Sequence, residues 1–191
     1  MDTHNEYDVT FFEMLSQTSL SSAAEVVPFV HEWIKPKTVI DVGCGDGAWL
    51  AAFAERGCSV IGIDGAWVPR ERLRIGQQHF ITHDLVQPLP DSVYACRFDL
   101  VLSLEVAEHL PEARADGFVH DLARLGDRLL FSAAVPGQGG YGHVNEQPHE
   151  YWIERFEGLG FAHSALLQRR FGQREEVASW YRNNLLVFVK A

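Results

Sequence analysis

VIDVGCGDGAWL, residues 39–50, is the stretch of this sequence that decides the fold. An apolar run ends at Val42, three glycines follow at alternate positions, and a segment with apolar residues at helical spacing begins at Ala48. Glycine adopts positive φ readily and lets a ligand approach the backbone closely. The pattern predicts a buried strand, a tight turn and a helix whose N-terminus faces a ligand.

Short apolar runs rich in β-branched residues recur along the chain and alternate with amphipathic segments. Trp49, Ala52 and Phe53 mark one such segment, and Phe118 and Leu122 mark another. Nearly continuous apolarity is typical of strands that are covered on both faces. We therefore predict an α/β fold with a Rossmann-like, doubly wound and mostly parallel sheet. Its strands are expected at 38–42, 59–63, 79–82, 98–104 and 128–133.

Both ends of the chain extend this pattern. Helical spacing from Val26 to Ile34, ended by Pro36, indicates an N-terminal helical segment, residues 1–36, which we expect to cover the ligand site. A helix is predicted near 151–159. Runs at 161–170 and 184–190, with little between them to form a crossover helix, predict a C-terminal antiparallel hairpin. Residues 1–191 are thus expected to form one domain.

Composition excludes several classes of function. A net charge of −10 disfavours a nucleic-acid partner, because long-range electrostatics would repel a polyphosphate backbone. The three cysteines are scattered and form no disulfide or zinc pattern, which favours a cytoplasmic location. The chain carries neither a secretion signal nor an apolar run of about 18 residues, so no membrane span is predicted. Nothing in the sequence indicates an oligomeric state.

The glycine turn alone is compatible with two cofactors. Gly43, Gly45 and Ala48 also satisfy the dinucleotide fingerprint, with Asp64 placed to hold a ribose, so a nicotinamide-dependent oxidoreductase is one interpretation. Asp41 favours another, because its carboxylate would point toward the helix N-terminus that a pyrophosphate has to occupy. A cationic amino-acid ligand suits that carboxylate better.

Two later motifs complete the pattern: Asp84 and Leu85 follow the third predicted strand, and the fourth runs directly into Glu105-Val-Ala-Glu-His109. From Val39 to His109 the chain resembles the class I S-adenosylmethionine-dependent methyltransferases. The resemblance implies S-adenosylmethionine as the cofactor. It also implies that Asp41 and the turn from Gly43 to Gly47, which includes Cys44 and Gly45, hold the methionine moiety. Asp64 would hold the ribose hydroxyls, and Asp84 with Leu85 the adenine. Gly65 is expected among the cofactor-binding residues, and Ser103 and Leu104 are expected beside the methyl group.

Residues 136–150 form the most polar and aromatic passage of the chain, and they follow the fifth predicted strand. Ligands of open α/β sheets bind at this edge, so a glycine-rich hinge followed by His, Asn and Glu suits a lid over a substrate. The alternative is a surface loop whose Pro148 and His149 begin the next helix. The passage, together with residues 11–27, resembles small bacterial methyltransferases that act on sugars or secondary metabolites, which implies a small-molecule acceptor methylated on oxygen or nitrogen.

His109 and His143 are the candidate general bases, because an imidazole titrates near neutral pH and each follows a strand expected to flank the methyl group. Glu105 is a candidate for holding a substrate hydroxyl or amine. A structural role, such as orienting a helix, is the alternative for His109. A metal site built from Glu105, His109, His143 or His149 is conceivable but is not predicted, because no close ligand pair supports it. A non-catalytic S-adenosylmethionine-binding partner subunit is a further alternative.

Overall fold

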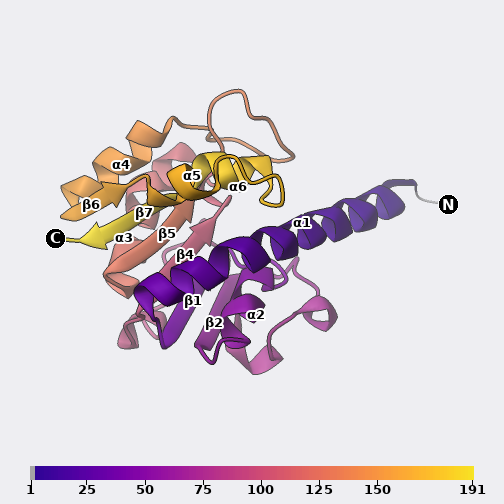
Figure 1. The fold of residues 1–191 in the computed structure, drawn as a ribbon. Helices are drawn as coiled ribbons and strands as arrows, with labels where there is room; N and C mark the ends of the chain where they lie inside the picture. Colours follow the sequence, from indigo (N-terminus) through magenta and orange to yellow (C-terminus); the bar gives the residue numbers. More distant parts are fainter. Residues whose placement is uncertain (1–2) are drawn as a thin grey trace.

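The computed structural model describes residues 3–191, with side chains from Ser16 onward, so residues 1 and 2 of the predicted N-terminal segment lie outside it. A seven-stranded sheet in the order β3-β2-β1-β4-β5-β7-β6 forms its centre. Figure 1 shows helices in front of and behind this sheet. The strands are β1 (Thr38–Val42), β2 (Ser59–Asp64), β3 (Phe80–Thr82), β4 (Leu100–Leu104), β5 (Arg128–Ser132), β6 (Phe161–Ser164) and β7 (Leu186–Lys190).

The first five strands are parallel, and β1 lies between β2 and β4 with Ile40 opposite both Ile61 and Val101. The last two strands are antiparallel, with β7 inserted between β5 and β6. The predicted fold class, a mostly parallel sheet finished by an antiparallel hairpin, is confirmed. The strand order places the turn after β1 and the segment after β4 next to each other at the carboxyl edge of the sheet.

Successive side chains of the strands point to opposite faces of the sheet and pack into two separate apolar cores. Val39 packs into one core and Ile40 into the other, and Leu100 and Val101 divide in the same way. Helices α1, α2, α5 and α6 cover the first core, and α3 and α4 cover the second. Their bounds are α1 (Thr3–Ile34), α2 (Ala48–Ala54), α3 (Ala115–Leu125), α4 (His149–Gly158), α5 (Leu166–Phe171) and α6 (Ser179–Asn184).

The N-terminal helix is longer than its apolar pattern indicates. It ends at Ile34, just before Pro36, as expected, but it begins as far back as Thr3 and runs through Pro28. Val26, Val27 and Val30 are fully buried against the sheet and α2. Figure 1 shows the other end of α1 projecting beyond the body of the domain.

The predicted strand over 161–170 is wrong beyond Ser164. The chain turns there into helix α5, whose first backbone N–H, from Leu166, donates to the Ser164 hydroxyl at 3.3 Å. Leu167 and Phe171, about one helical turn apart, are both buried in the core that α1 and α2 cover. Likewise, α6 occupies residues 179–184, so the hairpin strands are joined by two short helices instead of a simple loop.

Within the part of the chain that the structure describes, no helix combines the length and apolarity needed to cross a bilayer.

Gly43 generates a stability prediction. Its φ is +89°, and a Cβ there would lie 2.2 Å from Cγ2 of Val106. Gly43→Ala should therefore lower the free energy of unfolding by the strain of positive φ, about 1–2 kcal/mol, plus an overpacking cost of about 1–3 kcal/mol. Gly45→Ala is the matched control, because its φ is +54° and its Cβ would meet nothing within 4 Å. Urea unfolding of both variants measures the difference, and equal destabilisation would contradict the packing argument.

Candidate functional site

The residues predicted to bind the cofactor all lie at or just after the carboxyl ends of four adjacent strands. Because these strands are parallel neighbours in the order β3-β2-β1-β4, their ends form one continuous edge. Along this edge lie Asp84 and Leu85 after β3, Asp64 and Gly65 at β2, Asp41, Gly43, Cys44 and Gly45 at β1, and Ser103 and Leu104 at β4.

The glycine turn is fastened to the neighbouring strand. The backbone N–H groups of Gly43 and Cys44 both donate to the carbonyl oxygen of Ile63, at 2.7 and 3.2 Å. Asp46 closes the turn at the helix end: its Oδ1 accepts the Ala48 N–H at 3.1 Å, and its Oδ2 lies 2.8 Å from Nε of Arg74. A carboxylate thus already occupies the N-terminus of α2.

Asp41 is the most unusual of the predicted residues. Its side chain is 2 % exposed, and its Oδ1 is buried without a hydrogen-bond partner. Burial, and secondly the neighbouring Asp64 carboxylate, raise the pKa of Asp41 to about 7. A buried carboxylate without a partner is costly, and a ligand cation is the group that would compensate it.

Asp64, by contrast, is well supplied with donors. It accepts the backbone N–H of Gly45 at 2.7 Å and that of Gly65 at 2.6 Å. Burial still raises the pKa of Asp64, although these two hydrogen bonds and one from Trp67 oppose the shift. Trp67, which the sequence reasoning missed, has its indole over Gly65, where an added Cβ would lie 2.1 Å from the ring, and remains 61 % exposed. The signal in the sequence that could have identified Trp67 is a tryptophan shortly after the end of a predicted strand.

The remaining predicted cofactor residues differ in their exposure. Asp84 is exposed, and its Oδ1 accepts the Val86 N–H at 3.1 Å. The side chain of Leu85 belongs to the core under α3, so only its backbone faces the edge. Ser103 is buried, and its hydroxyl has no partner. Leu104 packs into the core beneath α1 and α2.

Glu105 follows β4 in a strained conformation, with φ at +55°. Its carboxylate accepts hydrogen bonds from the side-chain amides of Gln138 at 3.0 Å and Asn184 at 3.2 Å. Burial raises the pKa of Glu105. Asn184, which the sequence reasoning missed, also donates to Oε1 of Gln138 at 2.8 Å and lies 3.3 Å from Nε2 of His149. His149 therefore begins α4 and contacts α6, away from His109 and His143.

The loop over 136–150 is fixed in place by its own polar residues. Backbone N–H groups of Val144 and Asn145 donate to the carbonyl of Glu108 at 2.9 and 3.0 Å. The Glu146 carboxylate accepts the N–H groups of Gly137 and Gly139 at 2.8 and 2.7 Å, and lies 2.8 Å from Nδ1 of His143. These bonds lower the pKa of Glu146, the one to His143 most strongly. The loop is thereby tied to the segment that follows β4.

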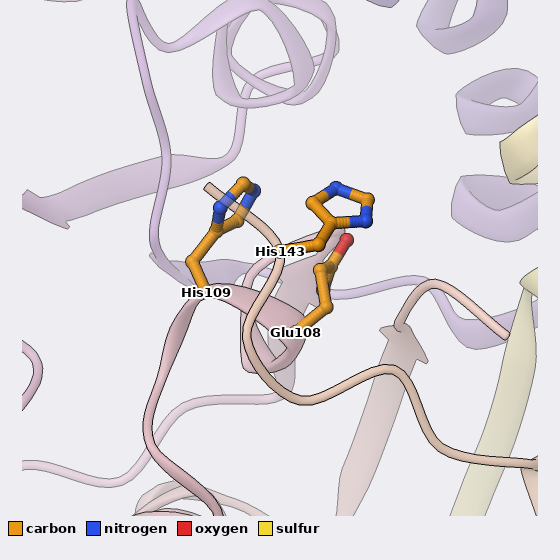
Figure 2. Close-up of side chains that lie close together, drawn as sticks. All are labelled: Glu108, His109 and His143. Carbon is orange, nitrogen blue, oxygen red and sulfur yellow. The ribbon is translucent and has the colours of Figure 1, made fainter. Parts of the chain in front are cut away.

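His109 and His143 come together as an edge-to-face pair with ring centroids 4.9 Å apart. Figure 2 shows the Glu108 side chain rising toward the two imidazoles. Glu108, missed from the sequence, is fully buried, and neither of its carboxylate oxygens has a partner. Burial, and secondly Glu105, raise the pKa of Glu108 to about 9, while burial and His143 lower that of His109.

Tyr181 connects α6 with α1 and with α2. Tyr181 of α6 lies 3.0 Å through its hydroxyl from that of Ser19, and its ring meets Trp49 edge-on at 5.1 Å. Burial raises the pKa of Tyr181 to about 12, and Asp41 and Glu105 contribute in the same direction. Tyr181 therefore lies within electrostatic reach of both carboxylates. It escaped the sequence reasoning because the tail carries no local motif.

The pKa of Asp41 leads to a prediction about stability. The folded protein retains this proton up to about pH 7, whereas the unfolded chain releases it near the ordinary value of 3.8, so Asp41 makes the fold less stable as pH rises through that interval. Asp41→Asn should be more stable than the wild type at pH 8, by up to about 4 kcal/mol, and should lose this advantage near pH 4. Urea unfolding of both proteins at the two pH values tests this, and a pH-independent difference would rule out the assigned cause.

Known proteins share this architecture. Over the whole chain the fold superposes with a TM-score of 0.63 on 86 % of the magnesium protoporphyrin IX methyltransferase of Synechocystis, at 23 % sequence identity. Among curated proteins, the ubiquinone biosynthesis O-methyltransferase of Azotobacter vinelandii is 34 % identical over 68 % of this chain and 56 % of its own length. That of Pseudomonas paraeruginosa is 28 % identical over 77 % and 63 %.

The chain thus spans less than two thirds of the length of these curated relatives. The family model described as a methyltransferase domain matches residues 17–129, which include α1 from Gln17 onward and the sheet as far as β5. The match contains the glycine turn, Asp41, Asp64 and the segment after β4. The chain belongs to this methyltransferase domain family, within the class I methyltransferases that use S-adenosylmethionine.

Proposed function

We propose that this protein transfers a methyl group from S-adenosylmethionine to a hydroxyl oxygen of a small-molecule acceptor. The observation that carries the proposal is Asp41, a buried carboxylate with an unpartnered oxygen beside the glycine turn. The ammonium of the methionine moiety would supply the missing positive charge. The next strand, β4, leads into Glu105 and His109, at the place where a methyl group would be presented.

The rest of the cofactor fits along the same edge. Asp64 lies one strand further on, where two backbone N–H groups hold its carboxylate, which would accept the ribose hydroxyls. Exposed Trp67 offers an aromatic face next to it. Asp84 and the backbone of Leu85 would meet the adenine at the end of β3. On the other side, α1 and α6 meet through Ser19 and Tyr181 and would cover the methionine end.

Asp46 disfavours the nicotinamide alternative. A pyrophosphate in a dinucleotide site needs the free N–H groups at the start of the helix after the first strand. Here the Asp46 carboxylate accepts the Ala48 N–H, so a pyrophosphate at that position would meet a negative charge, with the Asp41 carboxyl buried in the strand before the turn. A sulfonium amino acid suits this electrostatic environment, whereas a diphosphate does not.

Oxygen is favoured over nitrogen as the methylated atom, because the similar curated proteins are named O-methyltransferases of ubiquinone biosynthesis. The loop that bears His143 also exposes Tyr141, at 86 %, and Val144, at 66 %. An acceptor with an apolar or aromatic body would cover these side chains. This supports a hydroxylated secondary metabolite more than a free sugar.

In the reaction, the acceptor oxygen attacks the methyl carbon in line with the carbon–sulfur bond. That bond breaks with its electron pair going to sulfur, which produces S-adenosylhomocysteine, and the hydroxyl proton leaves to a base or to water. Most of the protein's contribution is alignment. The loop that Glu146 stabilises holds the ring of His143 against that of His109. The acceptor hydroxyl would bind beside these two rings.

A direct test is to incubate the protein with S-adenosylmethionine and pools of small hydroxylated metabolites, and to follow S-adenosylhomocysteine release and methylated products by mass spectrometry. Phenolic and other aromatic pools should yield product. Release of S-adenosylhomocysteine with nitrogen-containing acceptors alone would contradict the assignment to oxygen.

Cofactor affinity should depend on the charge of Asp41. By calorimetry at pH 8, Asp41→Asn should weaken S-adenosylhomocysteine binding about tenfold to a hundredfold, because a charge-assisted hydrogen bond is lost. Wild-type affinity should fall as pH drops below about 7, since the proton on Asp41 then competes with the ligand. Asp127→Asn, a half-exposed aspartate directly before β5 at the opposite edge, is the matched control. Tight NADH binding would favour the oxidoreductase instead.

His143 should affect turnover and not cofactor binding. His143→Ala is expected to lower kcat about a hundredfold or more while S-adenosylhomocysteine affinity stays within twofold, because the imidazole faces the acceptor. His120→Ala, an exposed histidine on α3, is the control. Turnover by His143→Ala equal to that of wild type would remove His143 from the acceptor site.

A further inference from the structure

Three side chains in the proposed acceptor region bring potential metal-ligand atoms close together. Positioning an acceptor hydroxyl does not by itself require this arrangement. Glu108, His109 and His143 each offer one ligand atom, a carboxylate oxygen or an imidazole nitrogen, and these atoms all lie within 4.8 Å of one another. Figure 2 shows the three side chains gathered at one point. Glu108 and His109 come from the turn after β4, and His143 comes from the loop before α4. No local spacing in the sequence therefore connects His143 with the other two.

Glu108 provides an independent observation. Its side chain has no exposed surface, yet neither carboxylate oxygen has a hydrogen-bond partner. A charged carboxylate is rarely kept in a protein interior without a partner, because removing its charge from water is costly. No Lys or Arg is paired with Glu108 among the described residues, so a cation from solution is the group that would balance a charged Glu108.

One ring nitrogen of each imidazole contacts a hydrogen-bond acceptor, as is common for histidines that bind a metal through the other nitrogen. Nδ1 of His143 lies 2.8 Å from the Glu146 carboxylate, and Nδ1 of His109 lies 3.3 Å from the carbonyl oxygen of Gly142. Both contacts are with acceptors, so both rings carry the proton on Nδ1. A carboxylate or carbonyl on one ring nitrogen fixes the tautomer and leaves the lone pair of the other nitrogen for a cation.

We propose that Glu108, His109 and His143 bind a divalent transition-metal cation, and that the acceptor hydroxyl takes one of its remaining coordination positions. Two imidazoles and one carboxylate suit Mn²⁺, Co²⁺ or Zn²⁺, whereas Mg²⁺ and Ca²⁺ prefer ligand sets made of oxygen. Bonds of about 2.1 Å require ligand atoms no more than roughly 4 Å apart. Small rotations of His109, which is exposed, and of His143 would close the present spacing.

The role of this cation rests on the proposed function. The acceptor oxygen would donate a lone pair to the cation, which lowers the pKa of its hydroxyl, so that the proton passes to solvent water and the oxygen attacks the methyl carbon. In this arrangement His109 and His143 act as ligands, and neither serves as the general base. The site lies beside Glu105 at the end of β4, next to the strand that carries Asp41, so the cation would sit on the methyl side of the cofactor.

The test begins with full-length protein stripped by EDTA and titrated with Mn²⁺, followed by calorimetry and by the electron paramagnetic resonance signal of free Mn²⁺. One saturable site per chain is expected. Glu108→Gln, which keeps the shape of the side chain, and His143→Ala should each raise the Kd for Mn²⁺ at least tenfold. His120→Ala should leave it unchanged. Absence of a saturable site, or a site insensitive to Glu108→Gln and His143→Ala, overturns the proposal.

Gly140→Ala supplies a variant that retains every ligand. An added Cβ there would lie 2.3 Å from Nε2 of His143, so the ring has to shift and the Kd for Mn²⁺ should rise several-fold. Thermal unfolding of the stripped variants verifies that each of them is folded.

S-adenosylhomocysteine binding, measured on the same stripped samples, separates the two proposals. Cofactor binding that persists while Mn²⁺ fails to bind overturns only the cation site, whereas Mn²⁺ binding without cofactor binding overturns the methyltransferase function. In the assay, Mn²⁺ should restore at least tenfold more methyl transfer to stripped wild type. A full rate without added cation overturns its role in the reaction.

Discussion

Val106 fills the space in which a side chain at Gly43 would lie, and this close approach joins the two halves of the site. Gly43 belongs to the turn that would hold the cofactor, while Val106 belongs to the segment that carries Glu105 and His109. Because β1 and β4 are neighbours, the turn of one strand packs directly on the chain leaving the other. In the proposed reaction, the strand order of the sheet and the absence of one Cβ would therefore align the methyl donor with its acceptor.

Around this contact the protein keeps several groups that make the fold less stable. Asp41 and Glu108 are buried carboxylates with unpartnered oxygens, and Glu105 holds a positive φ. Each of these features costs free energy in the unliganded chain, and stabilising substitutes at such positions usually reduce function. Their concentration at one edge, between well-packed cores on both faces of the sheet, marks that edge as the place where ligands complete the structure.

Most of the sheet could be predicted because apolar patterning is a local property. The five parallel strands lie within two residues of their expected bounds. The prediction failed in the tail, where 166–171 combines β-tolerant and helix-tolerant residues and local preference does not decide. There Leu167 and Phe171 are buried in the core beneath α1, and Phe171 meets Phe29 of α1 edge-on, so the helix is stabilised by contacts with a segment distant in the sequence.

The sequence by itself determined the fold class and placed the acidic and glycine residues of the predicted cofactor site along one edge of the sheet, because these lie in short motifs whose spacing follows from a strand and its turn. Only the tertiary structure decided which residues meet beyond the end of β4. The contact of His143 with His109, the burial of Glu108 and the bonds from Asn184 to Glu105 join segments that are distant in the sequence. Such contacts depend on where loops return over the sheet, and no local periodicity records that path.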